Sequence, residues 1–331
     1  MRKTLSVILV LFVSTALFAA GSQEGSPSGE PETGEVVAWP TDTVTILVGV
    51  RAGGNQDLKA RLLAKYLADE IGTAVVVENM PGASGSLAAV NYLQEGPNTN
   101  TLHFAPLALL AMNPLYQDIS YSVDDFLPVA SFDTSNFGLF VRADGPFESF
   151  DDLLEYGEDN LIKFGSAGPG AANYLYSQAT FQLSEVQADT ITHGNANEGL
   201  SNVVAGTTDV NFAALNATAI DYINEGQLIP ILTYADETVT VGDFEIPTAQ
   251  SYGLDLSYAA YTYINTRAGT DPEVAEYITQ SIYKVYDNPD FQEEAARLNI
   301  QTLQDSPADI LAYVRRSGTQ ARELFDLIVR N

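Results

Sequence analysis

Short apolar runs alternate with amphipathic stretches along the first part of the chain. An apolar run at residues 43–48 predicts a buried strand, and the stretch 57–71 predicts a helix with one apolar face that ends at Gly72. The apolar positions of this predicted helix are Leu58, Leu62, Leu63, Tyr66, Leu67 and Ile71. The pattern further predicts strands at 74–78 and 101–105 and a short helix at 86–93. Strands that alternate with helices favour a parallel sheet.

The same alternation returns after Ser149, which forms a predicted capping box with Asp152. A strand is predicted at 161–164, a turn with the sequence GSAGPGA at 165–171, and a helix from 171 to about 181. Further strands are predicted at 190–193, 209–212 and 228–233. The C-terminal part is predicted to be helical, with helix starts at Pro272 and after Ser306.

The charge balance narrows the classes of partner. The 331 residues include 15 Lys and Arg against 43 Asp and Glu, which gives a formal net charge of −28. A surface this negative repels DNA, RNA and anionic lipid, so we expect no nucleic-acid partner.

The sequence has no cysteine and only two histidines. We therefore expect no disulfide, no thiol catalysis, and no metal site built from thiolates or several histidines.

The N-terminus has the three parts of a secretory signal. Arg2 and Lys3 precede an apolar run at 5–18, and small residues follow at 19–21. We expect residues 1–20 to be a cleaved signal peptide and the protein to be periplasmic or extracytoplasmic, with an uncleaved anchor as the alternative. A lipoprotein is not expected, because no cysteine stands at the cleavage point. The acidic, Gly/Ser/Pro-rich stretch at 21–38 predicts a flexible linker.

Two glycine-rich turns each follow a predicted strand and open a predicted helix: AGGNQD at 52–57 and GSAGPGA at 165–171. A helix start offers unpaired N–H groups and the positive end of a dipole, so it can bind an anion without a basic side chain. Ligands of open α/β sheets bind at the carboxyl ends of strands. Two such ends that face each other would grip an anion from both sides. Each turn alone is a weak signal that ordinary turn chemistry explains, and no nucleotide-binding loop is present.

Several segments, in order, resemble one known family. The segments WPTDTVTILVGVRAGGNQD, VVVENMPGASG and MNPLYQDISYSVDDFLPVA resemble the first half of tripartite tricarboxylate transporter substrate-binding proteins, also called the Bug family. GSAGPGA, AGTTDVNFAALNATAIDYINEGQLIPI, DFEIPTAQSYGLD and INTRAGTDPEV resemble the second half. The resemblance runs from about Trp39 to the C-terminus.

The resemblance implies an α/β fold of the type II periplasmic-binding-protein kind, a two-domain flytrap. Each domain would be a mixed, mostly parallel sheet flanked by helices, with domain 1 at 40–142 plus 262–331 and domain 2 at 143–261. The resemblance implies that the protein captures a small organic carboxylate between the domains and delivers it to the integral membrane subunits of a tripartite transporter. We expect a monomer without a cofactor.

The resemblance also implies ligand contacts through backbone amides and hydroxyls of the two turns. The matching positions are Ala52, Gly53, Gly54, Asn55 and Asp57 in the first turn and Ser166, Ala167, Gly168, Ala171 and Asn173 in the second. Asn136 matches a family asparagine near the expected first crossing between the domains, where it would act as a hinge or contact the ligand.

The chain departs from the family pattern at positions that bear on the ligand. Arg51 stands where a small residue is usual, and it would either clamp a second carboxylate or lie exposed in solvent. The apolar segment 105–109, with Leu107 at its centre, replaces a hydroxyl-rich loop. That segment would either contact an apolar ligand body or belong to the core. Val50 stands where an aromatic residue is usual, so a stacking wall for the ligand is missing.

Four further side chains have both a ligand-binding and a structural interpretation. Asp57 would bind a ligand or a water, or cap its helix. His193 ends a strand and would line the cleft or be a structural histidine. Asn216 and Thr218 follow a strand and would bond the carboxylate or cap the next helix.

An exported α/β chain has two possible functions other than transport. An exported hydrolase or lyase on a similar scaffold would need a nucleophile with a base, and the sequence has no GxSxG or HExxH motif, so we do not expect an enzyme. A receptor that presents its ligand to a sensor remains an alternative.

Overall fold

The structure is a computed structural model that describes residues 39–168, 171–194, 196–298 and 300–329. The predicted signal peptide at 1–20 and the linker at 21–38 lie outside the described residues. Every helix within the described ranges is too short or too polar to span a bilayer.

Three parallel strands form one side of the sheet. β1 (Val44–Val48) lies between β2 (Val75–Asn79) and β3 (Thr101–Pro106), and all three run in the same direction. Consecutive side chains at 46–48 in β1 are at most 2% exposed, which shows that both faces of the strand are covered. The parallel arrangement that the alternating pattern predicts is therefore found here.

A second parallel group has the same construction. β5 (Ile162–Ser166) lies between β6 (Ala188–Thr192) and β7 (Val210–Ala214). Both glycine-rich turns of the sequence follow the central strand of such a group, the first after β1 and the second after β5. The carboxyl ends of the two central strands are where an open α/β sheet binds ligands.

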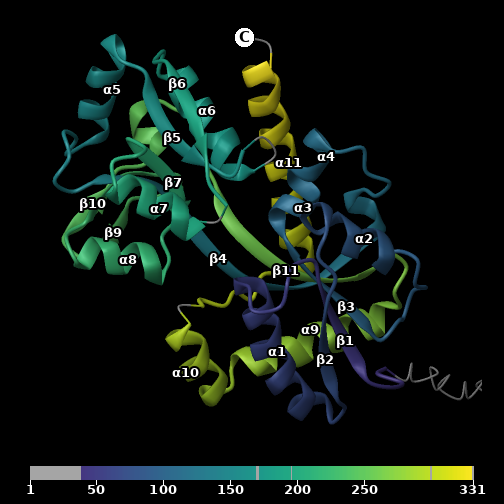
Figure 1. Cartoon of the computed structure of the whole chain (residues 1–331). Coiled ribbons are helices and arrows are strands. Elements are labelled where there is room, and N and C mark those ends of the chain that lie inside the picture. Colours follow the sequence, from purple (N-terminus) through teal and green to yellow (C-terminus); the bar gives the residue numbers. More distant parts are fainter. Residues whose placement is uncertain (1–38, 169–170, 195, 299, 330–331) are drawn as a thin grey trace, which may run out of the picture. The chain divides into compact units, whose positions relative to one another are not determined.

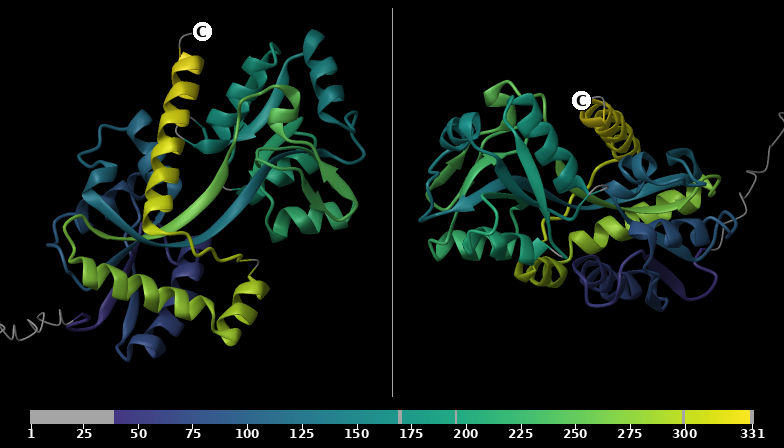
Figure 2. Two further views of the ribbon diagram at one scale, coloured as in Figure 1. Left: turned by 180° about the vertical axis from the view of Figure 1, so that it is seen from behind. Right: turned by 45° about the horizontal axis from the view of Figure 1, so that its top comes forward.

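Two long antiparallel strands join the two groups. β4 (Phe126–Arg142) pairs with β11 (Ala259–Arg267) as far as Asn136, and from Phe137 onward it pairs with β7 and with β8 (Leu228–Thr233). The order of the nine-stranded sheet is β2-β1-β3-β11-β4-β7-β5-β6, with β8 also paired to β4. Figures 1 and 2 show β4 and β11 side by side between the two groups. The sequence predicts a crossing near Asn136, but its local pattern does not predict β4 or β11.

The helices cover the faces of the sheet (Figure 1). In the described residues they are α1 (Asn55–Ile71), α2 (Ser86–Tyr92), α3 (Leu107–Ala111), α4 (Asn113–Tyr116), α5 (Phe150–Asp159), α6 (Ala172–Leu183), α7 (Ala196–Val204), α8 (Ala217–Asn224), α9 (Pro272–Tyr286), α10 (Pro289–Arg297) and α11 (Pro307–Val329). Short 3₁₀ turns lie at Ala83–Gly85, Val123–Asp125 and Ala249–Tyr252, and a small hairpin is formed by β9 (Val239–Val241) and β10 (Phe244–Ile246). The chain is an α/β protein, as predicted, with a mixed sheet.

The C-terminal helix α11 packs against α3 on one side and against α6 on the other, and it also contacts β4. Its buried side chains, which include Ile310 and Val314, belong to the same core cluster as Phe164 and Phe212 of the second strand group. A separate cluster surrounds β1 and contains Leu63 of α1. The helix starts predicted at Pro272 and after Ser306 are both present.

Helix α1 differs from its predicted pattern in two respects. It begins at Asn55, two residues earlier than predicted. Leu58, assigned to the apolar face, is 46% exposed, whereas Lys59 is only 8% exposed. The reason is a contact between distant segments: Asp133 of β4 is the acidic partner of the buried Lys59 ammonium. The two residues are 74 positions apart, so the periodicity of the helix cannot reveal this contact.

Candidate functional site

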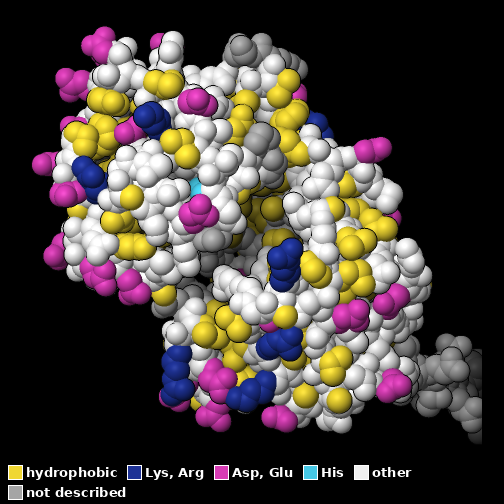
Figure 3. Space-filling view, in the orientation of Figure 1, with side chains coloured by type: hydrophobic (Ala, Val, Ile, Leu, Met, Phe, Trp, Pro, Cys, Tyr) yellow, Lys and Arg dark blue, Asp and Glu magenta, His cyan; other side chains and the backbone are white. Residues whose placement is uncertain are grey.

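A pocket of about 670 Å³ opens where the first turns of three helices meet. Helices α1, α7 and α8 each contribute their starting residues to its lining, and α1 comes from the β1 group whereas α7 and α8 come from the β5 group. The lining residues from these helix starts are Gly53, Gly54, Asn55, Ala196, Asn197, Asn216, Ala217 and Thr218. Figure 3 shows that this face of the molecule is hollowed.

The pocket is suited to an anion although the chain is strongly acidic. A helix start presents N–H groups that have no partner within the helix, together with the positive end of the helix dipole. The described residues that line the pocket include no Asp or Glu, and Lys59 is the one charged side chain among them. The acidic residues that give the chain its net charge of −28 are therefore absent from the described lining. The arrangement can bind a carboxylate through backbone amides.

The first turn is held by Asp57. Its carboxylate accepts hydrogen bonds from the backbone N–H of Gly53 at 2.8 Å, from Nε of Arg61 at 3.0 Å and from Nδ2 of Asn79 at 2.9 Å. The bond from Arg61 is the main cause that lowers the pKa of Asp57 to about 2. Asp57 is 1% exposed and lies outside the pocket lining, so these contacts use its carboxylate to fix the turn.

The other predicted residues of the first turn lie near its surface. Arg51 and Ala52 are exposed and do not line the pocket. The carbonyl of Arg51 accepts the N–H of Gly54 at 3.3 Å, which closes the turn. Gly53 has a φ of +83°, a left-handed conformation that favours glycine. The turn thus presents Gly53, Gly54 and Asn55 to the pocket.

The second turn forms its own hydrogen-bonded network. The N–H of Gly168 donates to Oγ of Ser166 at 3.0 Å, and the N–H of Ala167 donates to Oδ1 of Asn173 at 3.1 Å. Ala171 donates its N–H to the carbonyl of Gly168 at 3.1 Å. These five residues lie together at the carboxyl end of β5, and none of them lines the pocket formed by α1, α7 and α8.

His193 belongs to this second network. Its backbone N–H donates to the carbonyl of Ser166 at 2.9 Å, and Nδ2 of Asn173 lies 3.5 Å from its Nε2. The side chain is 8% exposed. A Cβ at Gly199 would lie 2.7 Å from Nε2, so glycine at this position leaves room for the imidazole. The structure thus places His193 beside the second turn and outside the lining of the large pocket.

The remaining predicted site residues lie in three different parts of the fold. Asn216 caps α8, because its Oδ1 accepts the N–H of Ala219 at 3.1 Å, and together with Thr218 it also lines the pocket. Asn136 lies where β4 changes partners, next to the lining residue Ser135. Leu107 begins α3 and is 1% exposed within the core, the alternative that the sequence analysis left open for it.

Sequence reasoning missed Lys59 and Asp133. Nζ of Lys59 donates a hydrogen bond to Oδ2 of Asp133, and both side chains are buried. Local sequence offered little signal for Lys59, because α1 also contains Arg61 and Lys65, which are both exposed. Leu58 and Leu298, both 46% exposed, complete the pocket lining as its large apolar side chains.

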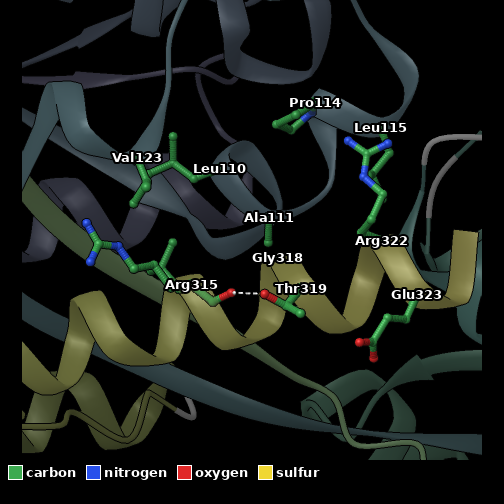
Figure 4. A pocket seen from close by; sticks show the side chains of 11 residues that line it. Leu110, Ala111, Pro114, Leu115, Val123, Arg315, Gly318, Thr319, Arg322 and Glu323 are labelled. Carbon is green, nitrogen blue, oxygen red and sulfur yellow. Dashed lines mark hydrogen bonds between the residues drawn. The ribbon is translucent and has the colours of Figure 1, made fainter.

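A second hollow, of about 640 Å³, lies between α11 and the helices α3 and α4 (Figure 4). It is lined by apolar side chains such as Leu110 and Val123, together with Arg315 and Arg322. Nη2 of Arg315 is bound to Oδ1 of Asp124 at 2.6 Å. Most of this lining comes from the sides of α3 and α11, and it includes the acidic side chain of Glu323, whereas the described lining of the first pocket has no acidic residue.

Comparison with known proteins gives a consistent result. The family described as "Tripartite tricarboxylate transporter family receptor" matches residues 59–326. Protein BugT of Bordetella pertussis is 26% identical over 295 residues, which cover 84% of this chain and 83% of BugT.

Solved structures share the fold. A TctC solute-binding protein from Polaromonas has a TM-score of 0.77 at 20% identity, covering 87% of this chain and 99% of the other. MatC from Rhodopseudomonas palustris, solved with bound malate, has a TM-score of 0.70 at 24% identity, covering 87% and 100%. A second R. palustris protein, solved with adipate, has a TM-score of 0.72 at 19% identity, covering 88% and 98%.

Proposed function

The chain belongs to the tripartite tricarboxylate transporter receptor family, and on that basis we propose that it captures a small organic carboxylate and delivers it to the integral membrane subunits of a tripartite transporter. Receptors of this family are periplasmic solute-binding proteins and not enzymes. The single observation that carries the carboxylate proposal is the pocket lined by three helix starts and one lysine, with no acidic residue among its described lining.

Backbone amides would hold the ligand. The first turn of α1 offers N–H groups from one side, and the first turns of α7 and α8 offer them from the other. Carboxylate oxygens accept such bonds strongly because they are charged. The N–H groups of Gly53 and Gly54 already donate to Asp57 and to the carbonyl of Arg51, so these two glycines shape the pocket wall. We therefore place Asn55 as the donor on one side of the ligand and Asn216 and Thr218 on the other. The structural relatives solved with malate and adipate support this class of ligand.

The second turn and Arg51 stay predicted ligand contacts. Ser166, Ala167 and Gly168 end the central strand of their own parallel group, as the first turn does in its group. Ligand contacts at these residues would require the two strand groups to move closer together than they are around the present pocket.

Closure would occur at the strands that join the two groups. We propose that domain 1, at 40–142 plus 262–331, and domain 2, at 143–261, rotate about β4 and β11 when ligand binds. The change of β4 pairing between Asn136 and Phe137 supports this hinge position. Ligand favours the closed state because only that state allows contacts from both sides. Small-angle scattering would test this: we expect a smaller radius of gyration with ligand, and an unchanged radius at saturating ligand would contradict closure.

A thermal-shift screen tests the function directly. Purified protein would be heated with malate, adipate, citrate, aromatic acids and amino acids, and with neutral amides of the same acids as controls. A ligand at about 100 times its dissociation constant adds about 2.7 kcal/mol to the free energy of unfolding. We expect at least one carboxylate to raise the melting temperature while its amide does not. A panel in which no acid stabilises the protein would refute the proposal.

Delivery and location need cellular experiments. We expect the chain in the periplasmic fraction, without residues 1–20. Deletion of its gene should abolish uptake of the carboxylate identified by the screen, and restoring the gene should recover uptake. Uptake that persists at the wild-type rate without the chain would argue for a sensory role.

A further inference from the structure

Lys59 lies in an unusual position for a charged side chain. It is 8% exposed, and it is one of the residues that line the pocket. Its ammonium has three N–H donors, and the hydrogen bond to Oδ2 of Asp133 uses one of them. Asp133 itself is 2% exposed. Lys59 is therefore a buried cation in the pocket lining, and its bond to Asp133 uses one of its three N–H donors.

A contribution to folding stability does not explain why the Lys59–Asp133 ion pair is buried. Removing two charges from water costs more than their attraction returns unless every oxygen and proton finds a partner. Oδ1 of Asp133 is buried and has no hydrogen-bond partner in the described part of the chain. The pair is therefore incompletely satisfied, and Lys59 is the member of the pair that lines the pocket.

The surrounding residues indicate what the ammonium would meet. Asn55 stands at the start of α1 and Lys59 follows one turn later, so the two lie about 5–6 Å apart on the same face of the helix. Both line the pocket, as do the exposed apolar side chains of Leu58 and Leu298. A ligand with two anionic groups joined by a short apolar chain matches this pattern.

We infer that Lys59 selects ligands that carry a second anionic group, and that Asp133 is the positioning residue that holds its ammonium at the pocket. This inference rests on the proposed function, because one carboxylate of the ligand must sit at the helix starts. The second carboxylate accepts an N–H from Lys59. The charge of Asp133 repels that second carboxylate and so limits the affinity.

The experiment compares glutarate and adipate with their monoamides, which keep one carboxylate and nearly the same shape. Isothermal titration calorimetry would give the ratio of monoamide to dicarboxylate dissociation constants for each protein. We expect wild-type protein to prefer the dicarboxylate, and Lys59→Met to reduce that preference at least tenfold. Asp133→Asn should raise the preference about threefold or more, because the amide still accepts from Lys59 but carries no charge.

Two further variants separate selection from folding. Lys59→Met leaves Asp133 buried without a partner, so the double variant Lys59→Met/Asp133→Asn removes both charges and should show the same loss of preference. Lys65→Met is the matched control: it lies on the same helix and removes an ion pair with Glu294 at the surface. It should keep the wild-type ratio within about twofold.

The outcomes are distinct. A wild-type preference that survives in both Lys59→Met and the double variant overturns the inference and leaves the proposed function intact. Equal dissociation constants of the dicarboxylate and its monoamide for the wild-type protein would also overturn the inference and leave the proposed function intact. A wild-type protein that binds none of these acids and none of the carboxylates in the thermal screen overturns both.

Discussion

The carboxylate of Asp57 accepts the backbone N–H of Gly53 at 2.8 Å, and this contact ties the glycine turn to the helix that follows it. The same carboxylate also binds Arg61 and Asn79, so one buried side chain connects the turn, the helix and the end of β2. The shape of the pocket at the start of α1 therefore depends on a residue outside the pocket lining.

Asp57→Asn should reduce both stability and ligand affinity. The amide keeps the size of the side chain but loses the charge, and one of its two polar atoms can no longer accept a hydrogen bond. We expect the free energy of unfolding to fall by about 1–3 kcal/mol, measured by urea denaturation. Asp69→Asn, on the exposed side of the same helix, is the control and should change it by less than about 0.5 kcal/mol. Equal effects of the two variants would contradict the structural role of Asp57.

His103 should make the protein less stable in mild acid. Burial lowers its pKa to about 4, and its ring stacks on Tyr92 with 5.3 Å between centroids. Between pH 6.5 and 4 the unfolded chain binds a proton at this histidine and the folded chain does not, so stability falls as the pH falls. The loss from pH 7 to pH 4.5 should be about 2–3 kcal/mol.

His103→Phe tests that assignment because it keeps an aromatic ring and removes the titration. Urea denaturation at pH 7 and at pH 4.5 should show a smaller pH effect in the variant by about the same 2–3 kcal/mol. Identical pH effects in the two proteins would place the acid sensitivity elsewhere.

Asn197→Asp should separate ligand binding from folding. Asn197 lies in the first turn of α7 and lines the pocket. A carboxylate at a helix start is favourable for the helix by about 0.3–1 kcal/mol, whereas it repels an anionic ligand. We expect an unchanged or higher melting temperature and at least tenfold weaker carboxylate binding by calorimetry. Asn197→Ala controls for loss of the side chain, and Asn91→Asp adds the same charge outside the pocket lining; equal losses in these variants would argue against charge repulsion.

Leu58→Ala and Leu62→Ala compare one substitution at two positions of α1. Leu58 is 46% exposed at the pocket and Leu62 is 5% exposed in the core. Leu62→Ala should lower the free energy of unfolding by about 2–5 kcal/mol, and Leu58→Ala by less than about 0.5 kcal/mol. Leu58→Ala should instead weaken binding of ligands with an apolar body. A stability loss of similar size in both variants would show that Leu58 is buried in solution.

Most of the strands, the positions of both glycine turns and the major helix starts could be predicted from local sequence patterns. The strand β1, the turn that follows it and the C-terminal helices lie within a few residues of their predicted places. Local patterns suffice for these elements because hydrophobic periodicity, helix caps and turn glycines each depend on residues that are close together in the sequence. The long strand β4 was not predicted, because its two parts obtain partners from β11, β7 and β8, which are distant in sequence.

The sequence by itself determined that the chain is an α/β protein and that amide-rich helix starts follow its central strands. Only the tertiary structure decided which helix starts share a pocket: α1 meets α7 and α8, whereas the GSAGPGA turn lies beside His193. It also decided that Lys59 is buried and Leu58 exposed. The physical reason is that a helix start offers its donors wherever it occurs, but their direction and the partner of a buried charge depend on segments that folding alone brings together.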